Sequence, residues 1–291
     1  MVTKASPAPT GKNELATTTA PGALALPGIM GDFLMAEAEK HQPKITMADT
    51  IMPRLSVLQA LSPTVNKRKP EYVPGAEPGM ILNVATLELF TERRLLPVHY
   101  IRHHVEWRQN RGGFVADHGE DDSIMARVVS RDDKNFEILD NGNIIQPTPT
   151  WYCLDLDNDG AMVVLSMPRT HSRTSRSWMS QVTNEKITHP GTGQKFNPPM
   201  FFRSWVLGTF LTSDDKNEWF IWKVLEAGPT IVDTVDGKPD GEPVLPLGTM
   251  EKAIRFRDML VSGAVKADAS HFEEAGGGNG GGSRSDDSAP M

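Results

Sequence analysis

Arginine and hydroxyl side chains gather in the stretch PRTHSRTSRSW, residues 168–178, which contains no acidic residue. Across residues 168–204, six cations stand against a single carboxylate, Glu185. A second basic stretch, residues 91–113, holds five arginines against two glutamates. Guanidinium and hydroxyl groups suit contacts to phosphate, and interleaved aromatic rings offer surfaces on which bases can stack. The pattern predicts a nucleic-acid-binding surface. The alternative is that these are ordinary surface arginines that balance acidic loops.

The predicted contacts are arginines that follow phosphates and aromatic rings that stack on bases. They are Tyr100, Arg102, Trp107, Arg108, Arg111, Arg169, Arg173, Arg176, Trp178, Arg203 and Trp205. On a helix, Arg173 and Arg176 would share a face, whereas Trp178 would lie off it. We therefore predict that the segment from Arg169 to Trp178 is a loop or a short, irregular helix when DNA is bound.

Metal chemistry has two candidate patterns. His99, His103 and His104 lie in one strand-like run, but the sequence places no third ligand at a diagnostic spacing. We expect them to be exposed polar residues. The run DLDNDG, residues 155–160, resembles the front of a calcium-binding loop, but Ser166 stands where that loop needs a bidentate glutamate. A hairpin turn is predicted there instead, with no metal and no cofactor.

Catalytic motifs are not found. The chain lacks G-x-S-x-G, a P-loop and G-x-G-x-x-G. The carboxylates that two-metal chemistry would need crowd residues 115–140, which we interpret as a solvated insertion with a little helix. A single cysteine, Cys153, excludes a disulfide framework and a cysteine-based zinc site, and is expected in the core. We predict a protein that is not an enzyme.

The elements that must position these residues are mainly strands. The run of residues 201–225, FFRSWVLGTFLTSDDKNEWFIWKVL, reads as an antiparallel hairpin whose aromatic residues are core, or stack on bases at a rim. A second hairpin is predicted from residues 151–156 and 162–167. The remaining predicted elements are a short helix at 32–40, a strand or turn leading into a short helix at 46–61, a strand at 80–90, a strand at 95–108 with a bulge near residues 100–101, helical character at 171–187, and an amphipathic helix at 249–261 stopped by Gly263.

This order predicts a mainly β fold: an OB-like or related antiparallel barrel with inserted loops, a C-terminal helix and disordered tails. Residues 1–45 are expected to be a low-complexity arm, 46–265 a single β-rich binding domain, and 266–291 a glycine-rich linker with a weakly acidic tip. The net charge of −7 by itself demands no nucleic-acid partner. The sequence shows neither a membrane-spanning run nor a secretory signal, so a cytoplasmic location is expected.

Two stretches resemble a family of tailed-phage and prophage proteins. They are MPRLSVLQALSPTVNKRKPEYVPGAEPGMILN, residues 52–83, and LLPVHYIRHHVEWRQNRGGF, residues 95–114. The resemblance extends to about Gly263 and omits both tails. More loosely, it links the chain to phage single-stranded-DNA-binding proteins with an OB fold. It carries over no catalytic residue, and the short acidic tip departs from the long acidic tails of those proteins.

The function expected from these observations is non-catalytic binding of single-stranded DNA in phage replication or recombination, in the host cytoplasm. Replication or recombination proteins recruited through the C-terminal tail are expected as further partners. One alternative is a virion or assembly protein that binds other proteins. A small DNA-processing enzyme is the third.

Overall fold

The computed structural model describes residues 52–109, 113–132, 135–189, 191–215, 217–230 and 248–263. These all belong to the compact unit Thr46–Met291. The predicted arm at 1–45, with its helix at 32–40, and the tail at 266–291 lie outside the described residues. The strands are β1 Leu55–Val57, β2 Ile81–Asn83, β3 Leu89–Phe90, β4 Glu92–Trp107, β5 Phe114–Asp117, β6 Val128–Arg131, β7 Glu137–Leu139, β8 Ile144–Asp155, β9 Ala161–Ser166, β10 Ile187–Thr188, β11 Lys195–Phe196, β12 Arg203–Ser213 and β13 Glu218–Thr230. The helices are α2 Ser172–Asn184 and α3 Thr249–Val261, with 3₁₀ turns η2 Pro63–Val65, η4 Asp122–Arg127, η5 Arg169–His171 and η6 Met200–Phe202.

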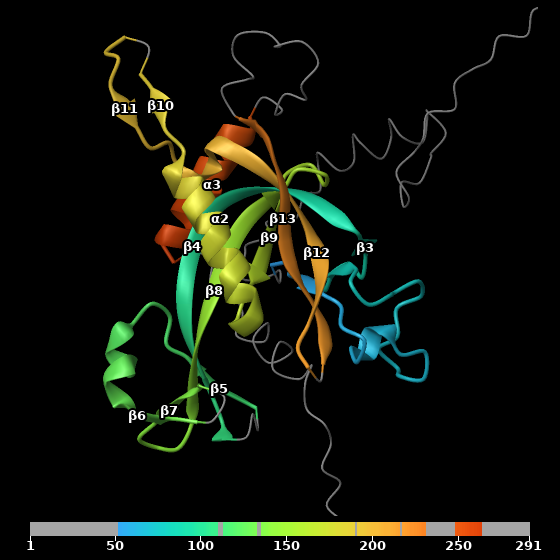
Figure 1. Ribbon diagram of the computed structural model, residues 1–291. Coiled ribbons are helices and arrows are strands. Elements are labelled where there is room, and N and C mark those ends of the chain that lie inside the picture. Colours follow the sequence, from blue (N-terminus) through green and yellow to red (C-terminus); the bar gives the residue numbers. More distant parts are fainter. Residues whose placement is uncertain are drawn as a thin grey trace, which may run out of the picture. The chain divides into compact units, whose positions relative to one another are not determined.

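The main sheet is antiparallel and curls around the long strands β4 and β8 (Figure 1). Its strand order is β13-β12-β4-β8-β7-β6, with β5 paired to β4 and β9 paired to β8. The sheet forms a half-barrel, and α3 follows it as the C-terminal helix. The predicted mainly β, antiparallel class is therefore confirmed.

The inner face of the sheet carries the aromatic core. Alternation along β8 places Trp151 and Cys153 on this face, where α2 covers them with Trp178. The indole rings of Trp151 and Trp178 are stacked, with centroids 4.0 Å apart and planes 21° apart. The Trp151 Nε1 donates a hydrogen bond of 2.8 Å to Ser175 Oγ. Trp205 and Trp222 of the β12–β13 hairpin join the same cluster, so these two aromatic side chains are core.

The outer face is covered by α3. Tyr152 and Leu154 alternate with the inner residues of β8 and contact Phe256 and Ala253 of the helix. The rings of Tyr152 and Phe256 meet edge to face, with centroids 6.4 Å apart. The helix begins at Thr249 and ends at Val261, followed by Gly263 at φ +70°, as the periodic apolar residues and the glycine predict. The sheet therefore lies between two helices.

In the main sheet, strands β12, β4 and β8 lie between β13 and β9. A separate small antiparallel sheet, β1-β2-β3, bridges these two strands. At one side, Val164 N donates to Pro53 O at 2.9 Å. At the other, the Gln59 side chain donates to Phe220 O and accepts from Phe220 N, both at 2.9 Å. The Gln59 amide thus substitutes for a neighbouring strand at this position of the free edge of β13.

Several sequence-based boundaries need correction. The predicted strand at 80–90 is two short strands, β2 and β3, because the chain turns at Leu87 with φ +61°. The predicted helix at the end of 46–61 is absent from the described residues 52–61, and a 3₁₀ turn follows at Pro63. The register shift between β4 and β8 falls between Pro97 and His99, two to three residues before the expected bulge.

The expected solvated insertion at 115–140 is also wrong in part. It contributes β5, β6 and β7 and buries Ile124 and Leu139 against Ile145 of β8. Its abundant carboxylates misled the sequence-based interpretation, since several of them are paired: Arg127 contacts Asp140 at 2.7 Å, and Arg131 contacts Glu137 at 2.6 Å.

The DLDNDG run forms the turn between β8 and β9, as predicted. Asp155 is fully buried, with its Oδ2 3.4 Å from Arg93 Nε, and its Oδ1 accepts a hydrogen bond from Asp157 N. Within the described residues, no group of three or more histidine, cysteine or acidic side chains could hold a metal ion. Of the helices in the described ranges, none has the length and apolar character needed to cross a membrane.

Candidate nucleic-acid interface

Helix α2 presents a polar stripe on the side that faces away from the core. Its buried residues, Ser175, Trp178 and Val182, follow a helical spacing, so the positions between them point outward. The exposed side chains are Arg173, Arg176, Ser177, Ser180, Gln181, Thr183 and Asn184. We name this set the α2 stripe. It offers two guanidinium groups about one turn apart, with hydroxyl and amide groups beyond them.

The α2 stripe lies in a long stretch that is nearly free of acid. Between Asp159 and Asp214 the sequence has one carboxylate side chain, Glu185. Its Oε1 accepts hydrogen bonds from Arg203 Nη2 at 2.7 Å and Arg203 Nε at 2.9 Å. Because Glu185 is already paired, it does not neutralise the arginines of the stripe.

A short hairpin, β10–β11, continues from the end of α2 and projects beyond it (Figure 1). Ile187 pairs with Phe196, and Thr188 pairs with Lys195. The hairpin is fastened at its base, where Asn197 Nδ2 donates a hydrogen bond to Thr183 O of the last helical turn. Sequence reasoning did not identify this element, because two-residue strands leave no periodic signal.

The tryptophans predicted to stack on bases are not accessible. Trp178 has 0% of its surface exposed, Trp205 has 4% and Trp107 has 8%. Their rings contact other core residues, so the stacking role predicted for them is wrong for this conformation. Tyr100 is half-buried and meets Trp151 edge to face at 5.1 Å.

The predicted arginines divide into exposed and engaged side chains. Arg102 and Arg108 are exposed on β4 and just after it, while Arg111 lies outside the described residues. Arg169 is half-buried at φ +52°, donates to Gln146 Oε1 at 2.9 Å and stacks on the Phe136 ring. Arg203 is occupied by Glu185 and by Gly228 O.

Of the two predicted basic stretches, the one at residues 168–204 therefore supplies one coherent surface, the α2 stripe. The segment from Arg169 to Trp178 was expected to be a loop or irregular helix in the DNA complex. Without DNA it is the 3₁₀ turn η5 followed by the regular helix α2, so the helical character expected for 171–187 is confirmed over Ser172–Asn184.

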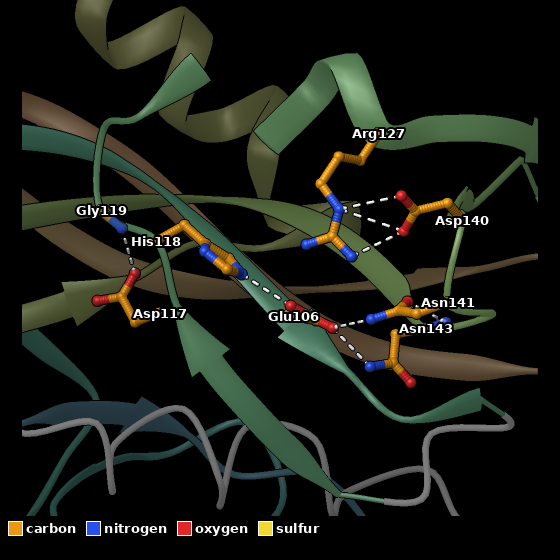
Figure 2. A network of polar contacts seen from close by, with 8 residues as sticks. All are labelled: Glu106, Asp117, His118, Gly119, Arg127, Asp140, Asn141 and Asn143. Carbon is orange, nitrogen blue, oxygen red and sulfur yellow. Dashed lines mark hydrogen bonds and ion pairs between the residues drawn. The ribbon is translucent and has the colours of Figure 1, made fainter. Parts of the chain in front are cut away.

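Sequence reasoning missed a buried polar network beside β4 (Figure 2). Glu106 is 4% exposed and accepts hydrogen bonds from the side chains of Asn141, Asn143 and His118. Burial opposes ionisation of Glu106, but the three donors outweigh it and lower its pKa. The carboxylate therefore remains charged and connects two loops, the one between β7 and β8 and the one after β5, to strand β4. The spacing N-x-N at 141–143 places both amides near Glu106, but the sequence alone does not identify Glu106 as their partner.

Two further histidine–carboxylate contacts lie along the same strand. His103 Nδ1 lies 2.8 Å from Asp117 Oδ2, and His104 Nε2 lies 3.3 Å from Asp122 Oδ1. His103 and His104 are 7% and 4% exposed, which corrects the expectation that these are exposed strand residues. The neighbouring Tyr152 hydroxyl stays protonated, because burial raises its pKa. We interpret the cluster as a structural clamp on the β5 loop.

Replacing Glu106 with alanine should lower the free energy of unfolding by about 2–3 kcal/mol, since three donors lose a charged acceptor. Urea denaturation at pH 7 measures it. The folded pKa of Glu106 lies below the ordinary 4.5, so the contribution is complete above that pH and is lost as pH falls through the folded pKa. The control is Glu120→Ala, which removes an exposed carboxylate from the loop that carries His118. Equal effects of the two changes would contradict the importance of the network.

The comparisons with known proteins address the family alone. Residues 21–263 match the family described as Pam3 phage gp34-like protein. The chain belongs to this family. No curated protein and no solved structure matches it. The expected membership in a phage protein family is confirmed, and the match begins about thirty residues before the stretch that carried the resemblance. The looser likeness of this phage-family protein to single-stranded-DNA-binding proteins stays a prediction.

Proposed function

We propose that this phage-family protein binds single-stranded DNA without catalysis, in phage replication or recombination and in the host cytoplasm. The observation that supports it most is the α2 stripe. Arg173 and Arg176 are exposed about one turn apart, and the nearest carboxylate in sequence, Glu185, is occupied by Arg203. Guanidinium forks match phosphate oxygens, and nearby hydroxyl and amide groups add neutral contacts.

The half-barrel gives this surface a rigid base. Ser175 Oγ is bonded to Trp151 Nε1, and Thr174 Oγ1 donates to Trp222 O at 2.8 Å. These contacts fix the rotation of α2, so that the arginines cannot turn toward the core. A pre-ordered row of donors loses little entropy when a flexible strand binds. Recruitment of replication or recombination proteins through residues 266–291 belongs to the same proposal.

Replacing Arg173 and Arg176 together with alanine should weaken binding to an oligothymidylate and flatten its salt dependence. Each phosphate contact to a single strand contributes about 0.7 to the slope of log affinity against log salt, so losing two lowers the slope by about 1.4. Fluorescence anisotropy across a salt series measures both. The melting temperature should stay near that of the parent, because exposed arginines contribute little to stability.

The matched control removes two arginines that are exposed but already paired, Arg127 and Arg131. The double alanine variant of this pair changes the net charge equally, yet should leave the salt slope close to that of the parent. Similar losses in both variants would indicate a general charge effect. A parent protein that fails to bind the oligonucleotide, or prefers duplex, would contradict the proposed function.

A second candidate is the virion or assembly protein. The outward face of the β12–β13 hairpin exposes Phe210 and Leu225, with 52% and 43% of their surfaces accessible. Exposed apolar side chains of this size suit a protein contact. A parent protein without salt-dependent oligonucleotide binding would favour this function. Metal-dependent turnover of DNA would instead favour the DNA-processing enzyme.

A further inference from the structure

The tertiary structure removes the tryptophans from the set of stacking groups, but it exposes another aromatic ring. Phe196, at the end of β11, has 41% of its surface accessible. Phenylalanine is normally buried, and the hairpin that carries it has no carboxylate side chain. Its neighbour Lys195 is also exposed. An accessible ring beside a cation combines the two contacts that a nucleotide offers, a base face and a phosphate.

The position of the ring relative to the α2 stripe is set by described contacts. Asn197, the next residue, is bonded to Thr183 O in the last turn of α2. Glu185 is held by Arg203 at the start of β12, so the two ends of the hairpin are both fastened near the C-terminal end of the helix. Since α2 has 13 residues and rises about 1.5 Å per residue, the stripe leads toward the hairpin over about 20 Å.

The loop of the hairpin is also ordered by its own side chains. His189 Nδ1 accepts hydrogen bonds from Gly191 N and Thr192 N, both at 3.2 Å. His189 N and Gln194 O are paired at 2.9 Å across the strands. These bonds keep the hairpin closed, so Phe196 projects from a defined strand.

We propose that Phe196 is the base-stacking contact of this protein and that the path of the bound strand runs from the α2 stripe onto the β10–β11 hairpin. The inference rests on the proposed function and names its ligand more narrowly, as nucleic acid with unpaired bases. Bases in a duplex are stacked on one another and present only their edges in the grooves, whereas an unpaired base offers a face to an aromatic ring. The arginines of α2 contact phosphates, and Phe196 selects single strands.

The test replaces Phe196 with alanine, leucine or tyrosine in the full chain and measures anisotropy with oligothymidylate. Stacking of one base is lost in the alanine variant, which should bind about 5- to 150-fold more weakly, with an unchanged salt slope. Leucine keeps an apolar side chain but has no ring face, so it should weaken binding similarly. Tyrosine should bind like the parent. An oligonucleotide of the same length with abasic sites should show no difference between parent and alanine variants.

Phe210→Ala is the matched control. Phe210 is an exposed phenylalanine on a different hairpin, β12–β13, and its ring centroid lies 5.2 Å from Lys223 Nζ. It should bind like the parent. Parent-like binding by Phe196→Ala, with weakened binding by the Arg173/Arg176 variant, would overturn this inference and leave the proposed function standing. Full binding by the leucine variant, or equal losses in both phenylalanine variants, would overturn it too. A parent protein that does not bind the oligonucleotide would overturn both this inference and the proposed function.

Discussion

Replacing Trp178 with alanine should lower the free energy of unfolding by about 3–5 kcal/mol, the usual cost of emptying a large aromatic site in a core. The ring is fully buried and stacks on Trp151 at 4.0 Å. It also sits at the centre of the contact between α2 and the inner face of the sheet, so a cavity there loosens the helix that carries the proposed interface. Guanidinium denaturation followed by far-ultraviolet circular dichroism measures the change.

Two comparisons separate a core role from a binding role. Trp178→Phe retains a ring for Trp151 and should lose clearly less stability than the alanine variant. Oligonucleotide affinity, measured where the alanine variant is still folded, should fall only as far as α2 loosens. An alanine variant that is as stable as the parent but binds DNA weakly would show that the ring acts at the surface, as predicted from the sequence.

The free energy of unfolding should depend on pH through two groups that act in opposite directions. Burial lowers the pKa of His171 from 6.5 to about 4, and its Nδ1 accepts a hydrogen bond of 3.2 Å from Trp222 N. The unfolded chain therefore takes up a proton between about pH 6.5 and 4 that the folded chain does not. Stability from His171 is complete above pH 6.5 and falls by up to about 3 kcal/mol as the pH decreases to 4.

Asp155 opposes this loss. Burial raises the pKa of Asp155 from 3.8 to about 6, although the positive charge of Arg93 partly lowers it again. Here the folded chain takes up a proton between about pH 6 and 3.8 that the unfolded chain does not, so acidification stabilises the fold by up to about 3 kcal/mol. The parent should consequently show a shallow dependence over this range.

Single substitutions should reveal the two contributions. Asp155→Asn removes the compensating uptake, so its stability should fall more steeply than that of the parent from pH 6.5 to 4.5. His171→Asn should show the reverse, a gain in stability toward acid. Urea denaturation at four pH values in this range measures the slopes. Identical slopes in the parent and both variants would contradict the assignment to these residues.

Local patterns in the sequence determined most of the elements. The turn signal at 157–160 and the polar residues at 213–217 are hairpin connections between strands with strong β propensity, and both hairpins are present. The apolar arc of 249–261 and Gly263 describe one helix with its end. These features depend on neighbours within a few residues, so the sequence shows them directly. The mainly β, antiparallel class follows from the same patterns.

The assignment of side chains to core or surface depended on how the helices pack against the sheet. Local sequence patterns carry no information on this packing. Trp178 and Arg176 are two residues apart on one helix, and only the position of α2 on the sheet decides that the ring is buried and the arginine exposed. Glu106 remains ionised inside the protein because His118, Asn141 and Asn143 reach it from segments 12 to 37 residues away.

The sequence by itself therefore determined a phage-family β protein with basic stretches near its strands. Only the tertiary structure decided which cations are paired with a carboxylate. Glu185 neutralises Arg203, 18 residues distant, rather than the nearer arginines of α2. It also decided that the ring of Phe196 is exposed, in a hairpin too short for any periodic signal. Charge pairing and burial arise from long-range contacts, whereas hydrophobic spacing reports only on the local chain.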